Sequence, residues 1–374
     1  MIVDGFKQIS QKAAIEGIVL LKNTEGILPI KNNEMVSLFG RSQIDYYKSG
    51  TGSGGAVNVL YSVNALEGLR NEKVLINEEL VSIYKEYIKS SPFDNGGGGW
   101  AQEPWFQKEL MLTKDMVESA AKKSKKAIIF IGRTAGEDKD NVLEQGSYYL
   151  TDIEKNMIEK VSNSFKDVVI VFNVGNIIDM SYIETLGDKI KSIVYAWHGG
   201  QEGGNALAKV LSGNETPSGK LVDTIARKVS DYPSNANFGN KFKNLYVEDI
   251  YVGYRFFETF QRDAVLFPFG FGLSYTSFKT KVVEYKKTEQ EINLKFLVCN
   301  TGTSKGQEVI QMYCEAPQGK LGKPFVELIG FGKTTSLYPG DSQEITISIP
   351  LYRIASYDDG GYTGHKSAYV LEEG

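Results

Sequence analysis

A single glutamate, Glu137, occupies a position suited to proton transfer. It stands between Gly136 and Asp138 in a polar loop that follows a continuous apolar run at 127–131. Such a run is typical of a strand buried on both faces. In open α/β sheets, the loops just past the carboxyl ends of strands carry the chemistry. The loop leads to an S/T-x-x-E sequence at 151–154, which predicts the capped start of a helix.

An acidic side chain on such a loop is compatible with hydrolysis of a glycosidic bond. Enzymes of that kind use two carboxyl groups, one to protonate the leaving oxygen and one to attack the sugar or activate water. A glutamate in a charged loop is more often simply solvated. The residue pattern of this loop therefore leaves both interpretations open.

A glycine-rich segment at 50–55 invites a nucleotide-binding interpretation, which its details do not favour. Gly50, Gly52 and Gly55 fit G-x-G-x-x-G loosely, and the segment lacks the Lys-Ser/Thr ending of a phosphate-binding loop. The alternative is a loop whose backbone must come close to a ligand or to another domain, which glycine permits. We expect no cofactor.

Other catalytic chemistries find little support. The only histidines are His198, expected to shape a strand-to-helix turn, and His365, expected to be solvated. Two histidines cannot anchor a usual metal site, and no G-x-S-x-G nucleophile motif is present. Cys299 and Cys314 lack metal-ligand spacing. They are interpreted as two buried thiols in preference to a disulfide across a sheet.

Composition limits the class of protein. The 374 residues carry 41% hydrophobic and 11% aromatic residues, enough for packed cores in two or three domains. A net charge of −4 argues against nucleic acid or an anionic membrane as the main partner. No apolar run approaches the roughly 18 residues of a membrane span, and the first 17 residues have no apolar signal-peptide region. These features predict a soluble, cytoplasmic protein.

The first two thirds of the chain predict a mainly parallel sheet covered by helices. Apolar strands are expected at 35–39, 127–131, 167–173 and 192–197, and helices at 6–21, 64–70, 78–90, 177–186 and 206–211. Beyond residue 275, short strand-like runs at 291–300, 307–315, 325–333 and 344–350, separated by turns, predict a small β-sandwich.

Several motifs together resemble glycoside hydrolase family 3, the β-glucosidase-type enzymes, over essentially the whole chain. The motifs are AAIEGIVLLKNTEGILPI, KSGTGSGG, GRTAGEDKDN with GSYYLTD, AWHGGQEGGNALAKVLSGNETPSGKL, EDIYVGYRFFET, FPFGFGLSYTSF, and NTGTSKGQEVIQMYCEAP with KPFVELIGFGKT. The resemblance implies an (α/β)6 sandwich over 1–262, a connector at 263–275 and an immunoglobulin-like, fibronectin type III-like domain over 276–374 that lacks its last strand.

The resemblance also assigns roles to residues. It implies that Glu137 is the general acid/base, with Asp140 at the aspartate of the G-E-x-x-D type motif. Asn141 departs from the arginine of many members, which affects contacts of the loop and not the proton chemistry. Further residues are expected to bind substrate: Ser53 on the glycine-rich loop, Arg133, Trp100 and Trp105. The two tryptophans are equally compatible with anchoring the 96–99 loop.

The family's nucleophile is missing from this chain. It is an aspartate in an S-D-W type motif on a (β/α)8 barrel, and residues 230–232, Ser-Asp-Tyr, imitate the motif outside any barrel strand. We expect a barrel domain elsewhere in the full enzyme, in the order sandwich, fibronectin-like domain, barrel, and we interpret this chain as a truncated, inactive part. The substrate implied is a small β-glucoside or oligosaccharide; a homo-oligomer is compatible with the sequence. The alternative is a non-catalytic carbohydrate-binding or scaffold module.

Overall fold

The computed structural model describes residues 5–55 and 57–373. They form two compact units, one made of residues 5–220 with 272–275 and the other of residues 221–271 with 276–373. The sequence-based division instead extended the first domain to residue 262. Contacts of the helix α8 (Tyr254–Phe260) explain the difference, because Arg255 pairs with Glu327 and the Leu328 N–H donates to the Tyr254 hydroxyl. Segment 221–271 therefore groups with the β-rich residues.

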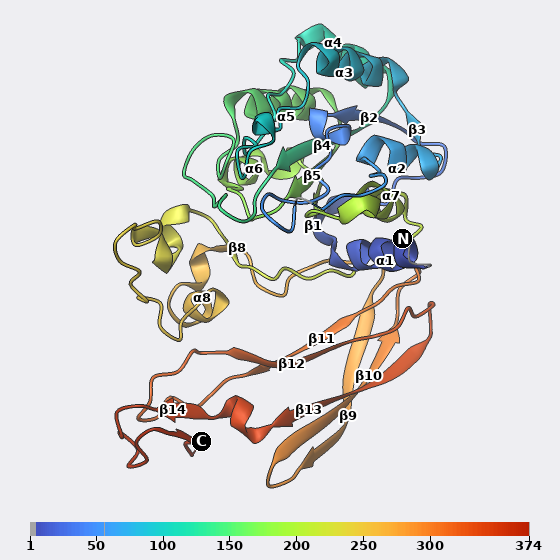
Figure 1. Ribbon diagram of the computed structural model, residues 1–374. Coiled ribbons are helices and arrows are strands. Elements are labelled where there is room, and N and C mark those ends of the chain that lie inside the picture. The colour runs from blue at the N-terminus through green and yellow to red at the C-terminus, as the bar shows by residue number, and fades with distance from the viewer. Residues whose placement is uncertain (1–4, 56, 374) are drawn as a thin grey trace. The chain divides into compact units, whose positions relative to one another are not determined.

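The first unit is a six-stranded sheet between two layers of helices (Figure 1). The strand order is β1-β6-β5-β4-β2-β3, and all neighbours are parallel except β1, which runs antiparallel to β6. The strands are β1 (Val19–Asn23), β2 (Met35–Phe39), β3 (Leu75–Ile76), β4 (Lys126–Arg133), β5 (Asp167–Val174) and β6 (Ser192–Tyr195). The helices are α1 (Phe6–Gly17), α2 (Ala65–Asn71), α3 (Glu78–Ser90), α4 (Lys114–Lys123), α5 (Asp152–Ser164), α6 (Ser181–Leu186) and α7 (Gly203–Ser212).

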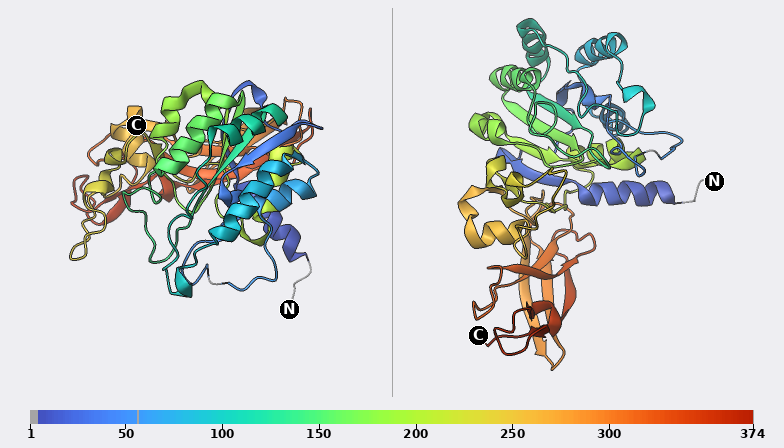
Figure 2. Two further views of the ribbon diagram at one scale, coloured as in Figure 1. Left: turned by 90° about the horizontal axis from the view of Figure 1, so that it is seen from above. Right: turned by 60° about the vertical axis from the view of Figure 1, so that its left-hand side comes forward.

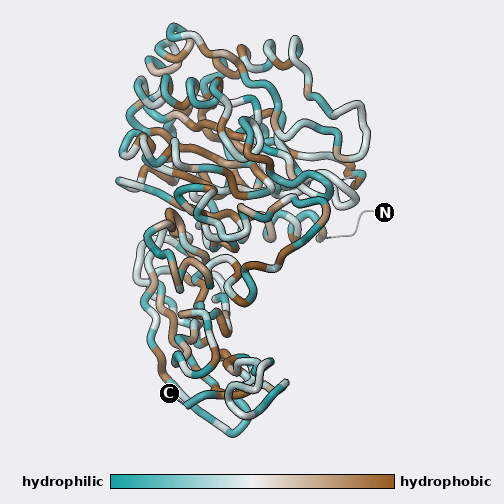
Figure 3. Tube along the Cα trace, turned by 90° about the vertical axis from the view of Figure 1, so that its left-hand side faces the viewer, coloured by the Kyte–Doolittle hydropathy of each residue, from teal (hydrophilic) through white to brown (hydrophobic). Residues whose placement is uncertain are grey.

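Both faces of the central strands are buried, as their continuous apolar runs predicted. Ile128 and Phe130 of β4 belong to the core that packs under α1, α2 and α7. On β2, Phe39 is also fully buried, and its ring meets Phe165 just beyond α5 with 5.5 Å between centroids. Figure 3 shows the hydrophobic trace concentrated in these strands, and the oblique view in Figure 2 shows helices on both sides of the sheet. The α/β class is confirmed.

The expected helix at 6–21 is wrong over its last four residues. Helix α1 ends at Gly17, Ile18 is extended, and residues 19–23 form the edge strand β1. Val19, Leu20 and Leu21 are all buried. Three consecutive buried side chains fit a strand enclosed on both faces, whereas a surface helix would expose one of them. The expected helix at 177–186 is likewise reduced to α6, residues 181–186.

The second unit contains the predicted antiparallel strands. Sheets β13-β10-β9 and β11-β12 pack face to face, because a Cβ placed on Gly330 or Gly332 of β12 would touch Ile347 or Ile345 of β13. Two further pairs, β7-β8 and β14-β15, complete the unit. The strands are β7 (Ile225–Ala226), β8 (Val265–Phe267), β9 (Phe278–Lys287), β10 (Glu291–Asn300), β11 (Val309–Cys314), β12 (Glu327–Lys333), β13 (Ser342–Pro350), β14 (Ser356–Asp358) and β15 (Ala368–Val370).

The two cysteines are free thiols. Cys299 lies on β10 and Cys314 on β11, and both side chains are half-buried where the sequence had suggested full burial.

Candidate active site

Neighbouring parallel strands bring the glycine-rich loop and the acidic loop together. Strands β2 and β4 pair in parallel, so their carboxyl ends lie at the same edge of the sheet. The glycine-rich loop lies beyond β2, and the acidic loop follows β4 directly. The Thr51 N–H donates to the Ala135 carbonyl at 2.8 Å, and Thr51 bridges to Gly136 in the manner of a parallel strand pair.

Glycine is required where the two loops touch. A Cβ on Gly50 would lie 1.8 Å from the Ala135 carbonyl oxygen. Gly52 has φ +86°, and its Cβ would lie 2.3 Å from the Glu137 Cβ. The close approach expected of this loop is therefore made to the acidic loop of the same unit. Dinucleotide binding is not needed to explain these glycines.

Among the residues that the structure describes, Glu137 has one carboxylate oxygen that accepts side-chain and backbone hydrogen bonds and one that accepts none. The Ser53 N–H and the Ser53 hydroxyl both donate to Glu137 Oε2, at 3.0 and 2.9 Å. The Thr51 hydroxyl donates to the Glu137 backbone carbonyl at 3.3 Å. Both Glu137 and Ser53 are exposed. Within residues 5–55 and 57–373, the side-chain bonds to this carboxylate all go to Oε2.

Two tryptophans from the segment before α4 hold the same loop. The Trp100 indole N–H donates to Asp138 Oδ2 at 2.7 Å, and the Trp105 indole N–H donates to the Asp140 carbonyl at 3.1 Å. The Lys139 ammonium lies 4.3 Å from the centre of the Trp105 ring. Both tryptophans thus anchor the acidic loop. Trp100 is still 52% exposed, so part of its ring faces solvent.

Arg133 was expected to bind substrate, but its side chain is buried inside the unit. It is 3% exposed, and its two terminal nitrogens donate to the two carboxylate oxygens of Glu154, each at 2.6 Å. Glu154 also closes the predicted capping box by accepting the Thr151 N–H. The buried pair joins the two ends of the acidic loop, from the last residue of β4 to the first turn of α5. The position of Arg133 gives no support to substrate binding.

Asp140 and Asn141 connect the acidic loop to its surroundings. Asp140 is exposed and accepts the Trp105 indole through its backbone carbonyl. The Asn141 amide donates to the Ile177 carbonyl at 3.0 Å and its side-chain oxygen accepts from Asn176. The residue that departs from the family pattern thus ties the loop to the segment after β5, in line with the expected effect on loop contacts.

Buried polar side chains at the ends of the neighbouring strands hold the loops of this site in position. The Asn173 side chain at the end of β5 exchanges two hydrogen bonds with the Tyr47 backbone and donates a third to the Trp197 carbonyl. His198 Nε2 bonds the Arg133 carbonyl at 2.9 Å, and burial lowers the pKa of His198 below its ordinary value. A neutral ring that donates from Nε2 is consistent with the structural role expected for His198.

Sequence reasoning missed some contributors to this site. Asn173 ends an apolar strand and had no distinguishing motif, and Asp138 was not separated from the other acids of the loop. Glu103 stands between the two tryptophans, and burial raises the pKa of its carboxyl despite the charge of Lys139. Among residues 5–55 and 57–373, no cluster of three or more His, Cys, Asp or Glu side chains is placed to hold a metal.

Comparison with known proteins identifies the family. A family model described as the glycosyl hydrolase family 3 C-terminal domain matches residues 18–275, and a fibronectin type III-like domain model matches residues 308–374. The chain belongs to glycosyl hydrolase family 3. The resemblance stated from the motifs is confirmed, and so is the combination of an α/β unit with a fibronectin type III-like unit.

The relatives of this family 3 chain are β-glucosidases. A β-glucosidase of Ruminococcus albus is 47% identical over 377 residues, which cover 100% of this chain and 39% of that protein. The crystal structure of a β-glucosidase from Paenibacillus barengoltzii is 55% identical with a TM-score of 0.98, covering 100% of this chain and 41% of that one. Thermotoga neapolitana β-glucosidase 3B in complex with glucose is 36% identical with a TM-score of 0.86, covering 94% and 49%. The chain spans less than half the length of these relatives.

The Ser230-Asp231-Tyr232 imitation of the nucleophile motif has a local structural role. Asp231 accepts the Lys228 N–H within a short 3₁₀ turn, and the Tyr232 hydroxyl bonds the backbone of residues 224 and 226. These contacts agree with the structural interpretation made from the sequence. No helix in the described residues is long and apolar enough to cross a membrane.

Proposed function

We propose that this chain supplies the general acid/base of a retaining β-glucosidase-type hydrolase, with Glu137 as the proton-transferring residue. The observation that carries the proposal is the Glu137 carboxylate, held at one oxygen by Ser53 and unbonded at the other within the described residues. Glu137 Oε1 would protonate the glycosidic oxygen as the aglycone leaves. The same carboxylate would then deprotonate the water that releases the sugar.

The nucleophile in this proposal is a carboxylate outside residues 1–374, on a (β/α)8 barrel. In retaining enzymes the two carboxyl groups lie roughly 5–5.5 Å apart, so the barrel must approach the edge of the sheet where the two loops meet. The β-glucosidase relatives, of which the chain covers 39% and 41%, leave room for such a domain. Small β-glucosides or oligosaccharides are the proposed substrates, in carbohydrate metabolism.

A hybrid enzyme tests the role of Glu137. Residues 1–374 replace the matching segment of the Ruminococcus albus β-glucosidase, which is 47% identical. We expect Glu137→Gln to lower kcat/KM for cellobiose by about 10³–10⁴, because its leaving group needs a proton. The loss for 2,4-dinitrophenyl β-glucoside, whose leaving group needs none, should stay below about tenfold. Azide should speed turnover of that substrate by attacking the glycosyl intermediate, which gives glucosyl azide and frees the nucleophile.

Glu144→Gln is the matched control. Glu144 is another exposed glutamate of the same loop, seven residues further along. We expect that variant to keep the activity of the unaltered hybrid for both substrates. Equal losses for the two substrates in Glu137→Gln, or no response to azide, would assign the acid/base to another residue.

The isolated chain provides a second test. Because the proposal places the nucleophile outside residues 1–374, the chain alone should release no glucose from p-nitrophenyl β-glucoside. Release of glucose that Glu137→Gln abolishes would contradict this part of the proposal.

A further inference from the structure

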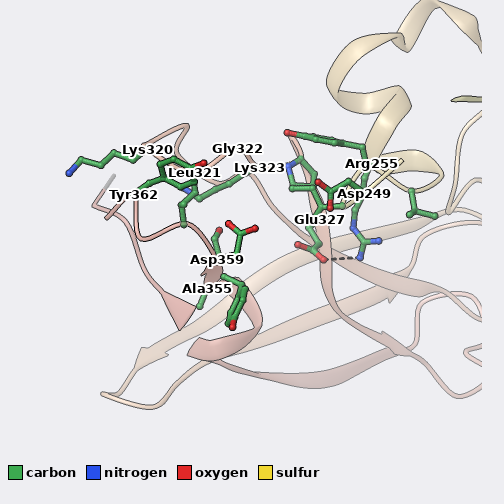
Figure 4. Close-up of a pocket in the computed structure, with 16 residues that line it drawn as sticks. Asp249, Arg255, Lys320, Leu321, Gly322, Lys323, Glu327, Ala355, Asp359 and Tyr362 are labelled. Carbon is green, nitrogen blue, oxygen red and sulfur yellow. Dashed lines mark hydrogen bonds and ion pairs between the residues drawn. The ribbon is translucent and has the colours of Figure 1, made fainter. Parts of the chain in front are cut away.

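A polar cleft of about 610 Å³ opens within the second unit (Figure 4). Three segments line it: residues 249–255 before and at the start of α8, residues 320–327 leading into β12, and residues 355–362 around β14. In Figure 4, Arg255 and Glu327 lie at one end, Lys320 and Tyr362 at the other, and Asp359 between them. A volume of this size is within the range of small-ligand sites.

Tyrosine rings are available on the walls of this cleft. Tyr251, Tyr357 and Tyr362 line it, and the last two are 51% and 68% exposed. Both rings therefore present much of their surface to solvent, where a ligand can reach them. The flat face of such a ring packs well against the C–H face of a sugar, while the hydroxyl group remains free to hydrogen-bond.

The turn that carries Tyr362 is fixed before any ligand binds. The buried Asp358 carboxylate accepts the N–H groups of residues 361, 362 and 363 and the Thr363 hydroxyl, at 2.6–2.9 Å. Gly361 and Gly364 supply the positive φ angles that the turn needs. A ring held on a preset turn loses little freedom when it binds, which favours affinity.

The charges of the cleft balance. Its lining contains three acidic side chains, Asp249, Glu327 and Asp359, and three basic ones, Arg255, Lys320 and Lys323. The lining thus has no formal net charge that would by itself draw an anion or a cation to the cleft. A mixture of acceptors and donors suits a neutral molecule with many hydroxyl groups, each of which can both donate and accept.

Two of the basic groups are already positioned. The Arg255 guanidinium donates to Glu327 Oε1 at 2.7 Å, and its Nε, although buried, has no hydrogen-bond partner. The Lys323 ammonium bonds the Pro317 carbonyl at 2.8 Å and pairs with Glu372. Asp249 and Asp359 have no side-chain hydrogen bond within the described residues, so their carboxylates remain available to accept from a ligand.

We propose that this cleft binds a neutral oligosaccharide, a short segment of β-linked glucan, and so holds substrate chains on the second unit. The choice of a glucan rests on the proposed function, whereas the neutral, polyhydroxylated chemistry rests on the cleft itself. None of the lining residues belongs to the acidic loop or to the glycine-rich loop. Binding here therefore does not require Glu137.

Titration calorimetry of the 374-residue chain with cellotetraose tests the proposal. We expect weak binding, with Kd in the range of about 0.1–1 mM. Tyr362→Ala should weaken it about tenfold, as expected for loss of one aromatic platform. Asp359→Ala should weaken it as well. Tyr362 is mostly exposed and its backbone bond to Asp358 survives the substitution, so the variant should keep the thermal unfolding midpoint of the unaltered chain.

Controls make the outcome decisive. Tyr285→Ala removes a similarly exposed ring from β9, outside the cleft, and should leave binding unchanged. Glu137→Gln should also leave it unchanged, which separates this site from the proposed acid/base role. No detectable binding, equal binding by Tyr362→Ala, loss of binding in Glu137→Gln, or displacement of cellotetraose by inorganic phosphate would each overturn the proposal.

Discussion

Gly52 lies against Glu137, and its replacement by alanine tests how precisely the acidic side chain must be held. The new Cβ would lie 2.3 Å from the Glu137 Cβ and 2.8 Å from Oε2, where ordinary contacts begin at 3.4 Å. The two side chains must therefore separate by about 1 Å. Gly52 also has φ +86°, a conformation that costs an alanine about 1–2 kcal/mol.

The loss of catalysis should be measurable in a variant that remains folded. A displacement of about 1 Å at a catalytic group costs on the order of 10²-fold in rate, equivalent to about 2.7 kcal/mol in the activation barrier. Backbone strain of about 1–2 kcal/mol lowers the unfolding temperature of a unit of this size by only a few degrees. The variant should be folded at 25 °C and should keep about 1% of the activity toward a substrate whose leaving group needs a proton.

The assay is hydrolysis of cellobiose and of 2,4-dinitrophenyl β-glucoside by the hybrid enzyme. Gly52→Ala should lose about a hundredfold in kcat/KM for cellobiose and much less for the activated substrate, because only the former needs the proton. Gly54→Ala is the matched control, since a Cβ there meets nothing within 4 Å and its φ is not positive; it should stay within about twofold of the unaltered hybrid. The same loss for both substrates, or equal activity of the two variants, would refute the reasoning.

Three further predictions concern residues of the first unit, including Glu109, a buried carboxyl that accepts the Arg41 and Leu110 N–H groups. Arg133→Met should lower the free energy of unfolding by about 3–5 kcal/mol in urea titration, because it leaves the Glu154 carboxylate buried without its partner; a loss below about 1 kcal/mol would contradict this. Burial raises the pKa of Glu109 to about 7 from 4.5, so the native chain keeps a proton that the unfolded chain releases. Stability should therefore fall by about 3 kcal/mol between pH 4.5 and pH 7 through this group, and Glu109→Gln should flatten that slope. Trp100→Phe keeps a ring but loses the bond to Asp138, so kcat of the hybrid should fall about three- to tenfold if anchoring matters; unchanged kcat with a loss only in Trp100→Ala would favour stacking on the sugar.

The sequence alone was sufficient for elements whose signal is local. The apolar runs at 127–131 and 167–173 lie within β4 and β5, and the helix expected at 78–90 has the same bounds as α3. The capping box at 151–154 is present as predicted. Each of these signals depends on residues within a few positions of one another. The loop that carries Glu137 was marked as a candidate in the same way, from the strand before it and the helix after it, whereas the choice of Glu137 among its acids and its role came from the family resemblance.

Local patterns failed where burial or pairing came from distant parts of the chain. Residues 19–21 continued the apolar pattern of α1, and only their enclosure in the sheet makes them strand β1. Strand β9 was not predicted because most of its side chains are exposed on both faces, so it shows no apolar alternation. Its membership of the sheet depends on its pairing with β10.

The candidate site shows the same division between features with a local sequence signal and features that depend on distant contacts. That a loop after β4 carries an acid was readable from the chain, as was the family to which the motifs belong. That Ser53 holds Glu137 across 84 positions, and that Arg133 pairs with Glu154 inside the unit instead of facing a substrate, depended on the parallel pairing of β2 with β4 and on the packing of α5. Hydrogen bonds and ion pairs act only over a few ångströms, so partners far apart in sequence are chosen by the fold that brings them together.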